Sequence, residues 1–145
     1  MNKKQEQMMV LLQDLCLAFI INSAATILNG GFQDVGLYLV GMFMAFAINY
    51  IAGIIIPVNL CGSAVAKFFR CKEGSFIFKL VRIFVINAIY VTIISFTIAL
   101  INVGPKIEVF EIWWKTYWIL HIVGFVASVL LESGCVALAK TFVKD

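Results

Sequence analysis

Three ionisable side chains, Asp14, Arg82 and Glu132, stand inside long apolar stretches of the sequence. Charged groups are costly in a nonpolar medium, where they usually face other polar groups and often mark an ion or substrate site. We expect Arg82 to pair with one of the two acids. The carboxyl groups could also take up and release a proton or hold a cation, because removal from water disfavours the charged form of an acid.

Helical spacing predicts that polar and small side chains gather on three faces. The first face carries Asp14, Ala18 and Asn22, and the second carries Asn87, Val91 and Ser95. The third is a continuous stripe made of His121, Gly124, Ser128, Glu132, Cys135 and Ala139. We expect these faces to meet, and the candidate intramembrane polar or ion site then comprises Asp14, Arg82, Glu132, Asn59, Asn87, Asn22 and Ser128.

A purely structural interpretation of the same residues stays open. Small side chains let helices approach closely and buried amides bond across them, so the faces could form a packing seam held by hydrogen bonds. His121 is the only histidine, and a metal site needs three or four ligands. We therefore expect His121 to be a residue of the bundle interior, with no metal site and no cofactor.

The composition indicates which medium surrounds these faces. The chain has 145 residues, of which 63% are hydrophobic and 13% charged, and its mean hydropathy is +1.02. Soluble domains are roughly 45–50% apolar and about 25% charged. We therefore predict a single integral membrane domain covering residues 1–145.

Four apolar segments have the length that a membrane span requires, which is about 20 residues. They cover residues 8–28, 36–56 or a little beyond, 76–102 and 112–139. The expected fold is all-α, a bundle of four transmembrane helices. Pro57 should kink or end the second helix, because proline removes a backbone hydrogen bond.

The basic residues predict the orientation of this bundle, because Lys and Arg are retained on the cytoplasmic side of short loops. Only Lys106 and Lys115 fall on one side of the four segments. The other nine of the eleven are Lys3, Lys4, Lys67, Arg70, Lys72, Lys79, Arg82, Lys140 and Lys144. Both termini should therefore be cytoplasmic. A cleavable signal peptide is the competing interpretation of the first segment, but Asp14 interrupts that run and the run continues past its small residues.

An aromatic cluster begins the fourth segment and consists of Trp113, Trp114, Tyr117 and Trp118. Amphipathic rings prefer the headgroup level of a bilayer, so this cluster indicates the outer interface. An aromatic cage for a ligand is the alternative.

An internal repeat appears when the sequence is superposed on itself with a shift of 73 residues, the separation of Asn29 and Asn102. Polar residues then coincide in an apolar background, in the pairs Asp14 with Asn87, Asn22 with Ser95, Asn29 with Asn102, and Asn59 with Glu132. We expect two parallel two-helix repeats, about 1–72 and 74–145, related by an axis along the membrane normal.

Three strings in the first half carry a family resemblance: Thr-Ile-Leu-Asn-Gly-Gly-Phe at 26–32, Met-Ala-Phe-Ala-Ile-Asn at 44–49 and Ile-Pro-Val at 56–58. This half resembles the two-helix unit of a bacterial membrane family, the domain of unknown function two-seven-nine-eight. Members of that family often carry the unit in duplicate. The resemblance implies a multi-pass protein of the bacterial inner membrane and brings no established activity. The second half departs from the pattern at 103–105, where Val-Gly-Pro stands.

The remaining motifs narrow the function classes. The sequence lacks a Gly-rich phosphate loop, a Gly-x-Ser-x-Gly elbow and a His-Glu-x-x-His zinc pattern. Its four cysteines form no Cys-x-x-Cys pair, and the net charge of +3 is not a nucleic-acid signal. We expect a non-enzyme that binds no nucleic acid.

Two hypotheses remain for its function. The first is a small transporter or permeation unit with acids in the bundle. The second is a membrane subunit or regulator whose basic stretch, Lys67 to Lys72, docks a partner protein or anionic lipid. A plain positive-inside loop would explain that stretch equally. The expected partners are the lipid bilayer, further copies of the chain and a second membrane protein.

Overall fold

The computed structural model describes residues 2–28, 31 and 34–143, but not the side chains of residues 3, 6 and 101–103. All regular structure in this described part of the chain is helical. The helices are α1 Lys3–Leu28, α2 Val35–Ile55, α3 Val58–Phe68, α4 Phe76–Val103 and α5 Glu108–Phe142. The all-α prediction is confirmed over these residues. Three residues of the string at 26–32 (Asn29, Gly30 and Phe32), Lys144 and the side chains of Lys3 and Asn102 lie outside the described residues.

Local signals in the sequence set the helix boundaries. Asp34 caps α2, where its Oδ1 accepts a hydrogen bond from the Leu37 amide at 3.0 Å, and Ser75 caps α4 in the same way through Phe78 at 3.1 Å. Gly104 ends α4 with φ of 80°, a conformation that glycine adopts at little cost. These caps allow the chain to reverse direction between long helices through short connections.

Pro57 interrupts the second span, as predicted. Helix α2 ends at Ile55, Ile56 is extended, and α3 begins at Val58. Proline at the start of a helix loses no hydrogen bond, because the first amides of a helix have no partner within it. The separate helix α3 was not predicted. Its apolar residues follow directly on those of the second span, so composition alone does not separate the two helices.

Four of the helices are long and apolar enough to cross a membrane, which confirms the predicted number of spans on length and composition. The candidate spans are Gln7–Leu28, Val35–Ile55, Phe76–Leu100 and Glu108–Phe142. At 1.5 Å per residue, each exceeds the roughly 30 Å of a hydrocarbon core. Large apolar side chains such as Phe43 and Leu130 are exposed on the outside of the bundle, the arrangement of a protein covered by lipid.

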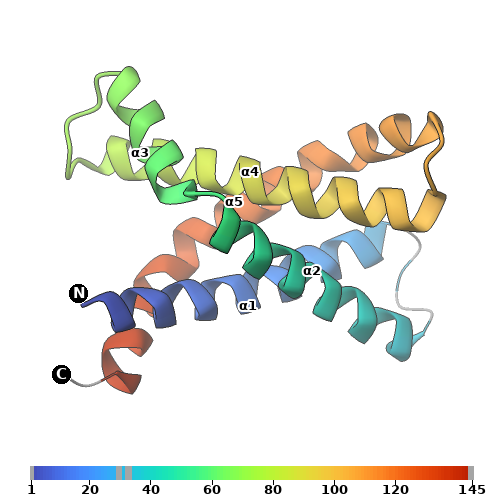
Figure 1. Cartoon of the computed structure of the whole chain (residues 1–145), viewed down its shortest axis with the longest axis horizontal. Coiled ribbons are helices and arrows are strands. Elements are labelled where there is room, and N and C mark those ends of the chain that lie inside the picture. Colours follow the sequence, from blue (N-terminus) through green and yellow to red (C-terminus); the bar gives the residue numbers. More distant parts are fainter. Residues whose placement is uncertain (1, 29–30, 32–33, 144–145) are drawn as a thin grey trace.

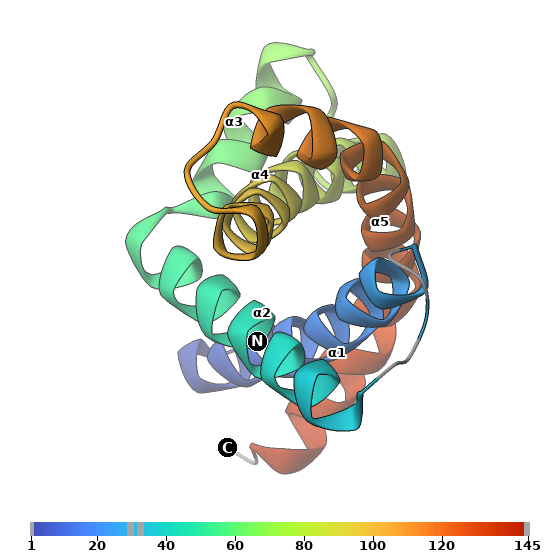
Figure 2. The ribbon, with the colours of Figure 1, turned by 90° about the vertical axis from the view of Figure 1, so that its right-hand side faces the viewer.

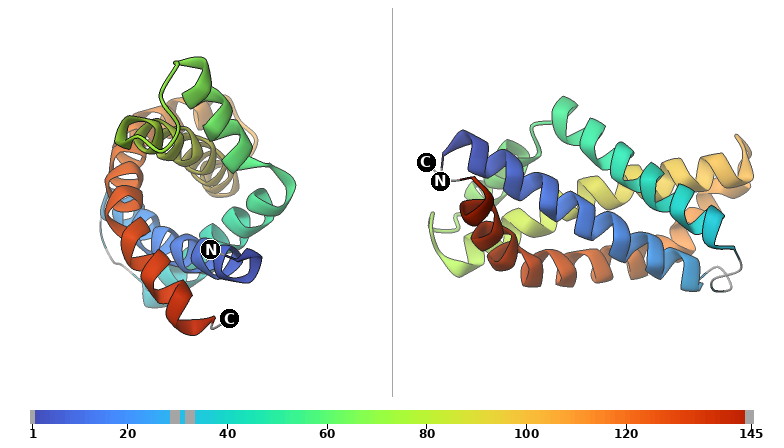
Figure 3. Two further views of the ribbon diagram at one scale, coloured as in Figure 1. Left: turned by 90° about the vertical axis from the view of Figure 1, so that its left-hand side faces the viewer. Right: turned by 90° about the horizontal axis from the view of Figure 1, so that it is seen from below.

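The four long helices surround a common axis, and α3 lies beside α4 at one end (Figure 1, Figure 2). Helix α1 packs against α2 and α5, and α4 packs against α2, α3 and α5. Both chain termini lie at the end that holds α3, and the α1–α2 and α4–α5 connections lie at the opposite end (Figure 3). Gln5 Nε2 donates to the Val143 carbonyl oxygen at 3.0 Å and so joins the first helix to the end of the last.

Buried apolar residues form three clusters along the axis. The cluster between α1, α4 and α5 contains Leu17, Ile21, Val91, Leu120 and Ala127. A second, between α1, α2 and α4, contains Ala18, Ala45 and Ile94. The third, nearer the termini, contains Ala52, Val58 and Tyr90. The second cluster includes two alanines, so α1, α2 and α4 approach one another closely at that level.

Candidate functional site

The three faces predicted from helical spacing are buried in the bundle. Asp14, Ala18 and Asn22 are buried on α1, as are Asn87, Val91 and Ser95 on α4. The stripe on α5 is buried at His121, Gly124, Ser128, Cys135 and Ala139, and partly buried at Glu132. The helical period therefore identifies the inward side of each span. It does not identify which side chains touch, and the contacts divide the candidate residues into separate groups.

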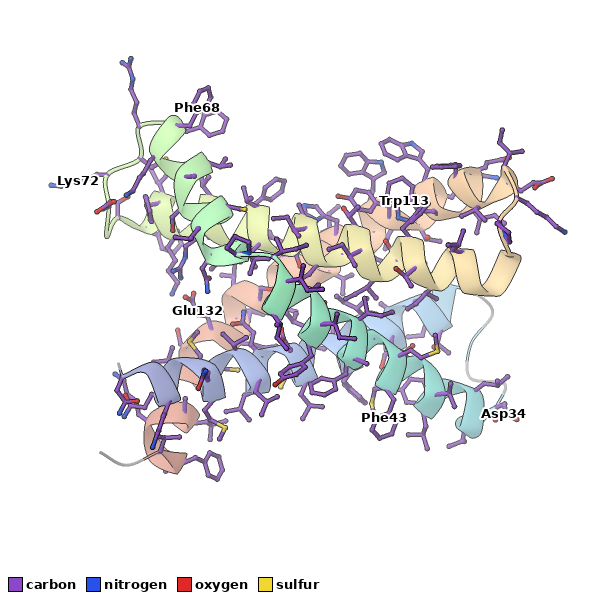
Figure 4. All side chains as sticks on the ribbon, in the orientation of Figure 1. Asp34, Phe43, Phe68, Lys72, Trp113 and Glu132 are labelled. Atoms are coloured by element: carbon purple, nitrogen blue, oxygen red, sulfur yellow. The ribbon has the colours of Figure 1, made fainter. Side chains whose placement is uncertain are left out.

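The first group is an ion cluster around Glu132 that joins α4 to α5. Arg82 Nη2 lies 3.1 Å from Glu132 Oε1, and Lys79 Nζ lies 2.8 Å from Oε2. The side chain of Glu132 is only 12% exposed, and its position on α5 is labelled in Figure 4. The expected pairing of Arg82 with an acid is confirmed, and Glu132 is that acid. Lys79 was predicted only as a cytoplasmic charge, although it lies one turn before Arg82 on the same helix face.

The second group consists of amides that bond between neighbouring helices. Asn87 Nδ2 donates to the His121 carbonyl oxygen at 2.9 Å and lies 3.0 Å from His121 Nδ1. Asn22 Nδ2 donates to the Tyr38 carbonyl oxygen at 3.0 Å. Both bonds link a helix to the next one in the chain, α4 to α5 and α1 to α2. Asn22 and Asn87 thus form hydrogen bonds between packed helices, as the structural interpretation of the polar faces expects.

The remaining candidate residues do not join one site. Ser128 is buried on α5, one turn from Gly124, on the seam between α4 and α5. Asn59 is exposed on the short helix α3, outside the interior of the bundle. The predicted grouping of Asn59 with Glu132 came from the repeat pairing alone, and no contact in the described part of the chain joins the two.

Asp14 stands apart from the ion cluster. Its side chain is in the core, with 3% of the residue exposed. In the part of the chain that the structure describes, the ion pairs of Lys79 and Arg82 go to Glu132, and no Lys, Arg or His pairs with Asp14. Asp14 is therefore a buried acid without a basic partner among the described residues.

Two polar side chains on other helices lie at the level of Asp14. One turn toward the opposite end, Ala18, Ala45 and Ile94 form a buried cluster, so the positions one turn nearer the termini lie at a common height on the three helices. Those positions are held by Asp14 on α1, Asn49 on α2 and Tyr90 on α4. We call these three residues the Asp14 layer.

Asn49 was not among the predicted site residues, yet it is completely buried. Neither its Nδ2 nor its Oδ1 has a hydrogen-bond partner among the described residues. Its neighbours on the same face of α2 fix its direction: Ala52 packs against Tyr90, and a Cβ on Gly53 would lie 2.8 Å from Tyr90 Oη. The signal in the sequence was an asparagine inside an apolar run, flanked on its own face by Ala45 and Ala52.

The Asp14 layer places a carboxyl group, an amide and a phenol at one height on three helices. A carboxyl group can exchange a proton, and carboxylate, amide and hydroxyl oxygens are ligands for hard cations. No group of three or more His, Cys, Asp or Glu residues that could hold a metal ion occurs in residues 2–28, 31 and 34–143. Proton exchange and binding of a small cation are the chemistry open to this layer.

Apolar hollows lie elsewhere, on the outer surface of the bundle. One, of about 450 Å³, is lined between α1 and α5 by residues that include Ile20, Ile122 and Leu130. Another, of about 440 Å³, is lined between α3, α4 and α5 by residues that include Val65, Phe84 and Phe125. Both hollows lack polar lining residues and suit acyl chains better than an ion.

No family model matches the chain, and neither the curated proteins nor the solved structures compared with it give a match. The resemblance to the two-helix bacterial family therefore stays a prediction. Any proposal about function rests on the geometry of the bundle itself.

Proposed function

We propose that this chain is a small transporter or permeation unit of the bacterial inner membrane, and that Asp14 is its essential acid. The observation that carries the proposal is the burial of Asp14 in a membrane-type core without a basic partner among the described residues. An isolated acid costs about 2.5–3.5 kcal/mol at the centre of a membrane on insertion scales, and such residues usually mark ion or proton pathways. A role for Asp14 in ion or proton movement would explain why the chain carries this unfavourable group.

Glu132 has a different role in this proposal. Two cations neutralise it, Arg82 at 3.1 Å and Lys79 at 2.8 Å, and they tie α4 to α5 near the end that holds the termini. Both carboxylate oxygens of Glu132 are engaged in these ion pairs. Glu132 is therefore a structural acid, and Asp14 is the functional one.

The orientation in the proposal has both termini in the cytoplasm. The basic residues support it, because Lys and Arg are retained on the cytoplasmic side. Among the basic residues that the structure describes, only Lys106 and Lys115 lie toward the opposite end of the bundle. The described cations toward the end of the termini are Lys4, Lys67, Arg70, Lys72, Lys79, Arg82 and Lys140.

A duplicated two-helix unit is the second part of the proposal. Its support is that α1 and α4 begin at residues 3 and 76, and α2 and α5 begin at residues 35 and 108, so both separations are 73 residues. Helix α3 ends at residue 68 and α5 at residue 142, a separation of 74 residues. Pro57 then explains why the first unit has a broken second helix while α5 is continuous. Parallel repeats of this kind occur in transporters, where substrate sites lie at the repeat interface.

Proteoliposomes test the proposal directly. Purified chain is reconstituted, and the flux of protons, Na⁺, K⁺ and a panel of small solutes is compared with that of empty liposomes. Flux is expected for the native chain and for Asp34→Asn, since Asp34 is an exposed helix cap whose asparagine replacement still accepts the capping bond. Asp14→Asn should abolish it. Absence of flux across the whole panel, or equal flux from Asp14→Asn, would overturn the proposal.

The second candidate function is a membrane subunit or regulator that docks anionic lipid or a partner protein through α3. The observation that favours it is the mixture of exposed rings and cations there. Phe68 is 82% exposed and follows Lys67, which pairs with Glu73 at 2.7 Å. Figure 4 shows Phe68 and Lys72 at the same end of the molecule. Exposed rings beside cations are typical of segments that lie at a membrane surface. Purification from native membranes tests it. A stoichiometric partner that is lost in Lys67→Gln/Lys72→Gln supports docking, and a homo-oligomer alone counts against it.

A further inference from the structure

We propose that Asp14, Asn49 and Tyr90 form a binding site for a small monovalent cation of the Na⁺ type, held between α1, α2 and α4. This inference rests on the proposed function in one respect, that the bound ion is the one which the transporter moves or couples to. The site itself is argued from geometry, and its binding test needs no transport.

The first step is the state of Asn49. Its amide is fully buried, and among the described residues both of its polar atoms lack a hydrogen-bond partner. Buried polar groups in proteins are almost always satisfied, so an orphaned pair of atoms calls for a ligand, an ion or a bound water. Asn22 and Asn87, the other buried asparagines among the described residues, both donate to a carbonyl oxygen of the next helix. Asn49 differs from them in having no such acceptor.

The second step is the meeting of charge and oxygen at one level. Asn49 lies on the face of α2 between Ala45, which packs with Ala18 of α1, and Ala52, which packs with Tyr90 of α4. The three side chains of the Asp14 layer supply a carboxylate, an amide oxygen and a phenol oxygen. Hard oxygens of this kind select alkali and alkaline-earth cations over the softer metals that prefer nitrogen and sulfur.

The third step is the charge of the site. When it is ionised, Asp14 supplies one negative charge, while Lys79 and Arg82 pair with Glu132. A monovalent cation makes the layer neutral, and a divalent cation would leave a net positive charge in the membrane core, where uncompensated charge is strongly disfavoured. Ca²⁺ and Mg²⁺ also take six or more oxygen ligands, often with several carboxylates. The layer therefore favours Na⁺.

The fourth step is the glycine beside the phenol. A Cβ on Gly53 would lie 2.8 Å from Tyr90 Oη and would displace it. Glycine at this position lets the hydroxyl of Tyr90 lie against the backbone of α2, one turn from Asn49. The close approach of α2 and α4 thus holds the phenol oxygen against α2, within one turn of Asn49.

The test is Na⁺ binding to the purified full chain in detergent, measured by dialysis with radioactive Na⁺ and by thermal unfolding in NaCl against choline chloride at equal ionic strength. Saturable Na⁺ binding is expected, with a rise of the unfolding midpoint by about 3 °C relative to choline. Asp14→Asn, Asn49→Ala and Tyr90→Phe should each remove the rise. The matched controls are Asp34→Asn, Asn59→Ala and Tyr50→Phe, whose residues lie outside the layer and are exposed; they should keep it.

Several results would overturn the site. They are no saturable Na⁺ binding to the native chain, an equal midpoint in NaCl and choline chloride, or a Na⁺ response that survives all three substitutions in the layer. The first two of these results are measured on the native chain. They therefore test the site even if the variants fail to fold. Na⁺ binding without flux in proteoliposomes would leave the site and remove the transport function. Flux without Na⁺ binding would do the reverse.

Discussion

Asn87 of α4 bonds to both the backbone and the ring of His121 on α5, at 2.9 Å to the carbonyl oxygen and 3.0 Å to Nδ1. Gly124, one turn further along α5, leaves space for the asparagine side chain. The side chain of Asn87 therefore fits against α5 because glycine, which has no Cβ, occupies position 124. Membrane helices lack a hydrophobic driving force toward one another, so pairs of this kind supply much of the specific contact between them.

Gly124→Ala should destabilise the bundle because the new Cβ would lie 2.5 Å from Asn87 Oδ1 and 3.3 Å from Val91 Cγ2. We expect a loss of roughly 1–3 kcal/mol in the free energy of unfolding, as overpacking costs about that much in well-packed cores. Unfolding by denaturant in detergent measures it. Gly134→Ala is the matched control on the same helix, where a Cβ meets nothing within 4 Å. That control should be neutral or slightly stabilising, and equal losses in both variants would contradict the packing argument.

Gly41 and Asn22 form the corresponding contact between α1 and α2. A Cβ on Gly41 would lie 2.7 Å from Asn22 Oδ1, while Asn22 Nδ2 bonds to the Tyr38 carbonyl oxygen at 3.0 Å. Gly41→Ala should therefore cost about 1–3 kcal/mol in the native background. It should cost much less in Asn22→Ala, which removes the obstructing amide. A double-mutant cycle measures the coupling, and additive losses would show that the glycine matters for another reason.

Glu132→Gln should weaken the α4–α5 contact, because it leaves Arg82 and Lys79 without their shared counter-charge. Removing one partner of a fully buried pair costs about 3–5 kcal/mol. Both cations are about a third or more exposed, so we expect roughly 1–2 kcal/mol here. The control is Glu111→Gln, whose pair with Lys115 has both side chains 69% exposed and should contribute little to stability because water and salt screen it. Chemical unfolding of both variants compares them, and a smaller loss for Glu132→Gln than for Glu111→Gln refutes the assignment.

Much of the fold could be predicted because membrane composition and helical period leave few alternatives. The apolar runs predict the spans, Pro57 predicts the break after α2, and the period of 3.6 residues predicts that Asp14 and Asn87 face inward. Each of these follows from local chemistry. None of them requires knowing which helix lies opposite.

The members of the candidate site were harder to predict, since contacts between helices depend on their relative height and rotation. Asn49 and Tyr90 lie at the height of Asp14 because Ala18, Ala45 and Ile94 pack together one turn away. No local sequence pattern encodes this relative height of α1, α2 and α4. Asn59 was grouped with the acids through the repeat, but it lies after the break at Pro57, which turns α3 out of the bundle interior. Lys79 was assigned to the surface by its charge, although its long side chain reaches Glu132.

Labelling of single cysteines tests the proposed orientation in intact cells. Cys71 lies in the connection between α3 and α4, at the end that holds the termini, and Lys106 lies in the connection between α4 and α5 at the opposite end. A membrane-impermeant maleimide should label Lys106→Cys in a chain without other cysteines. A chain that retains only Cys71 should be labelled after the cells are opened and not before. The physical reason is the retention of the basic end in the cytoplasm, where the membrane shields Cys71 from the reagent. Labelling of Cys71 in intact cells would reverse the orientation and place the Asp14 layer in the outer half of the membrane.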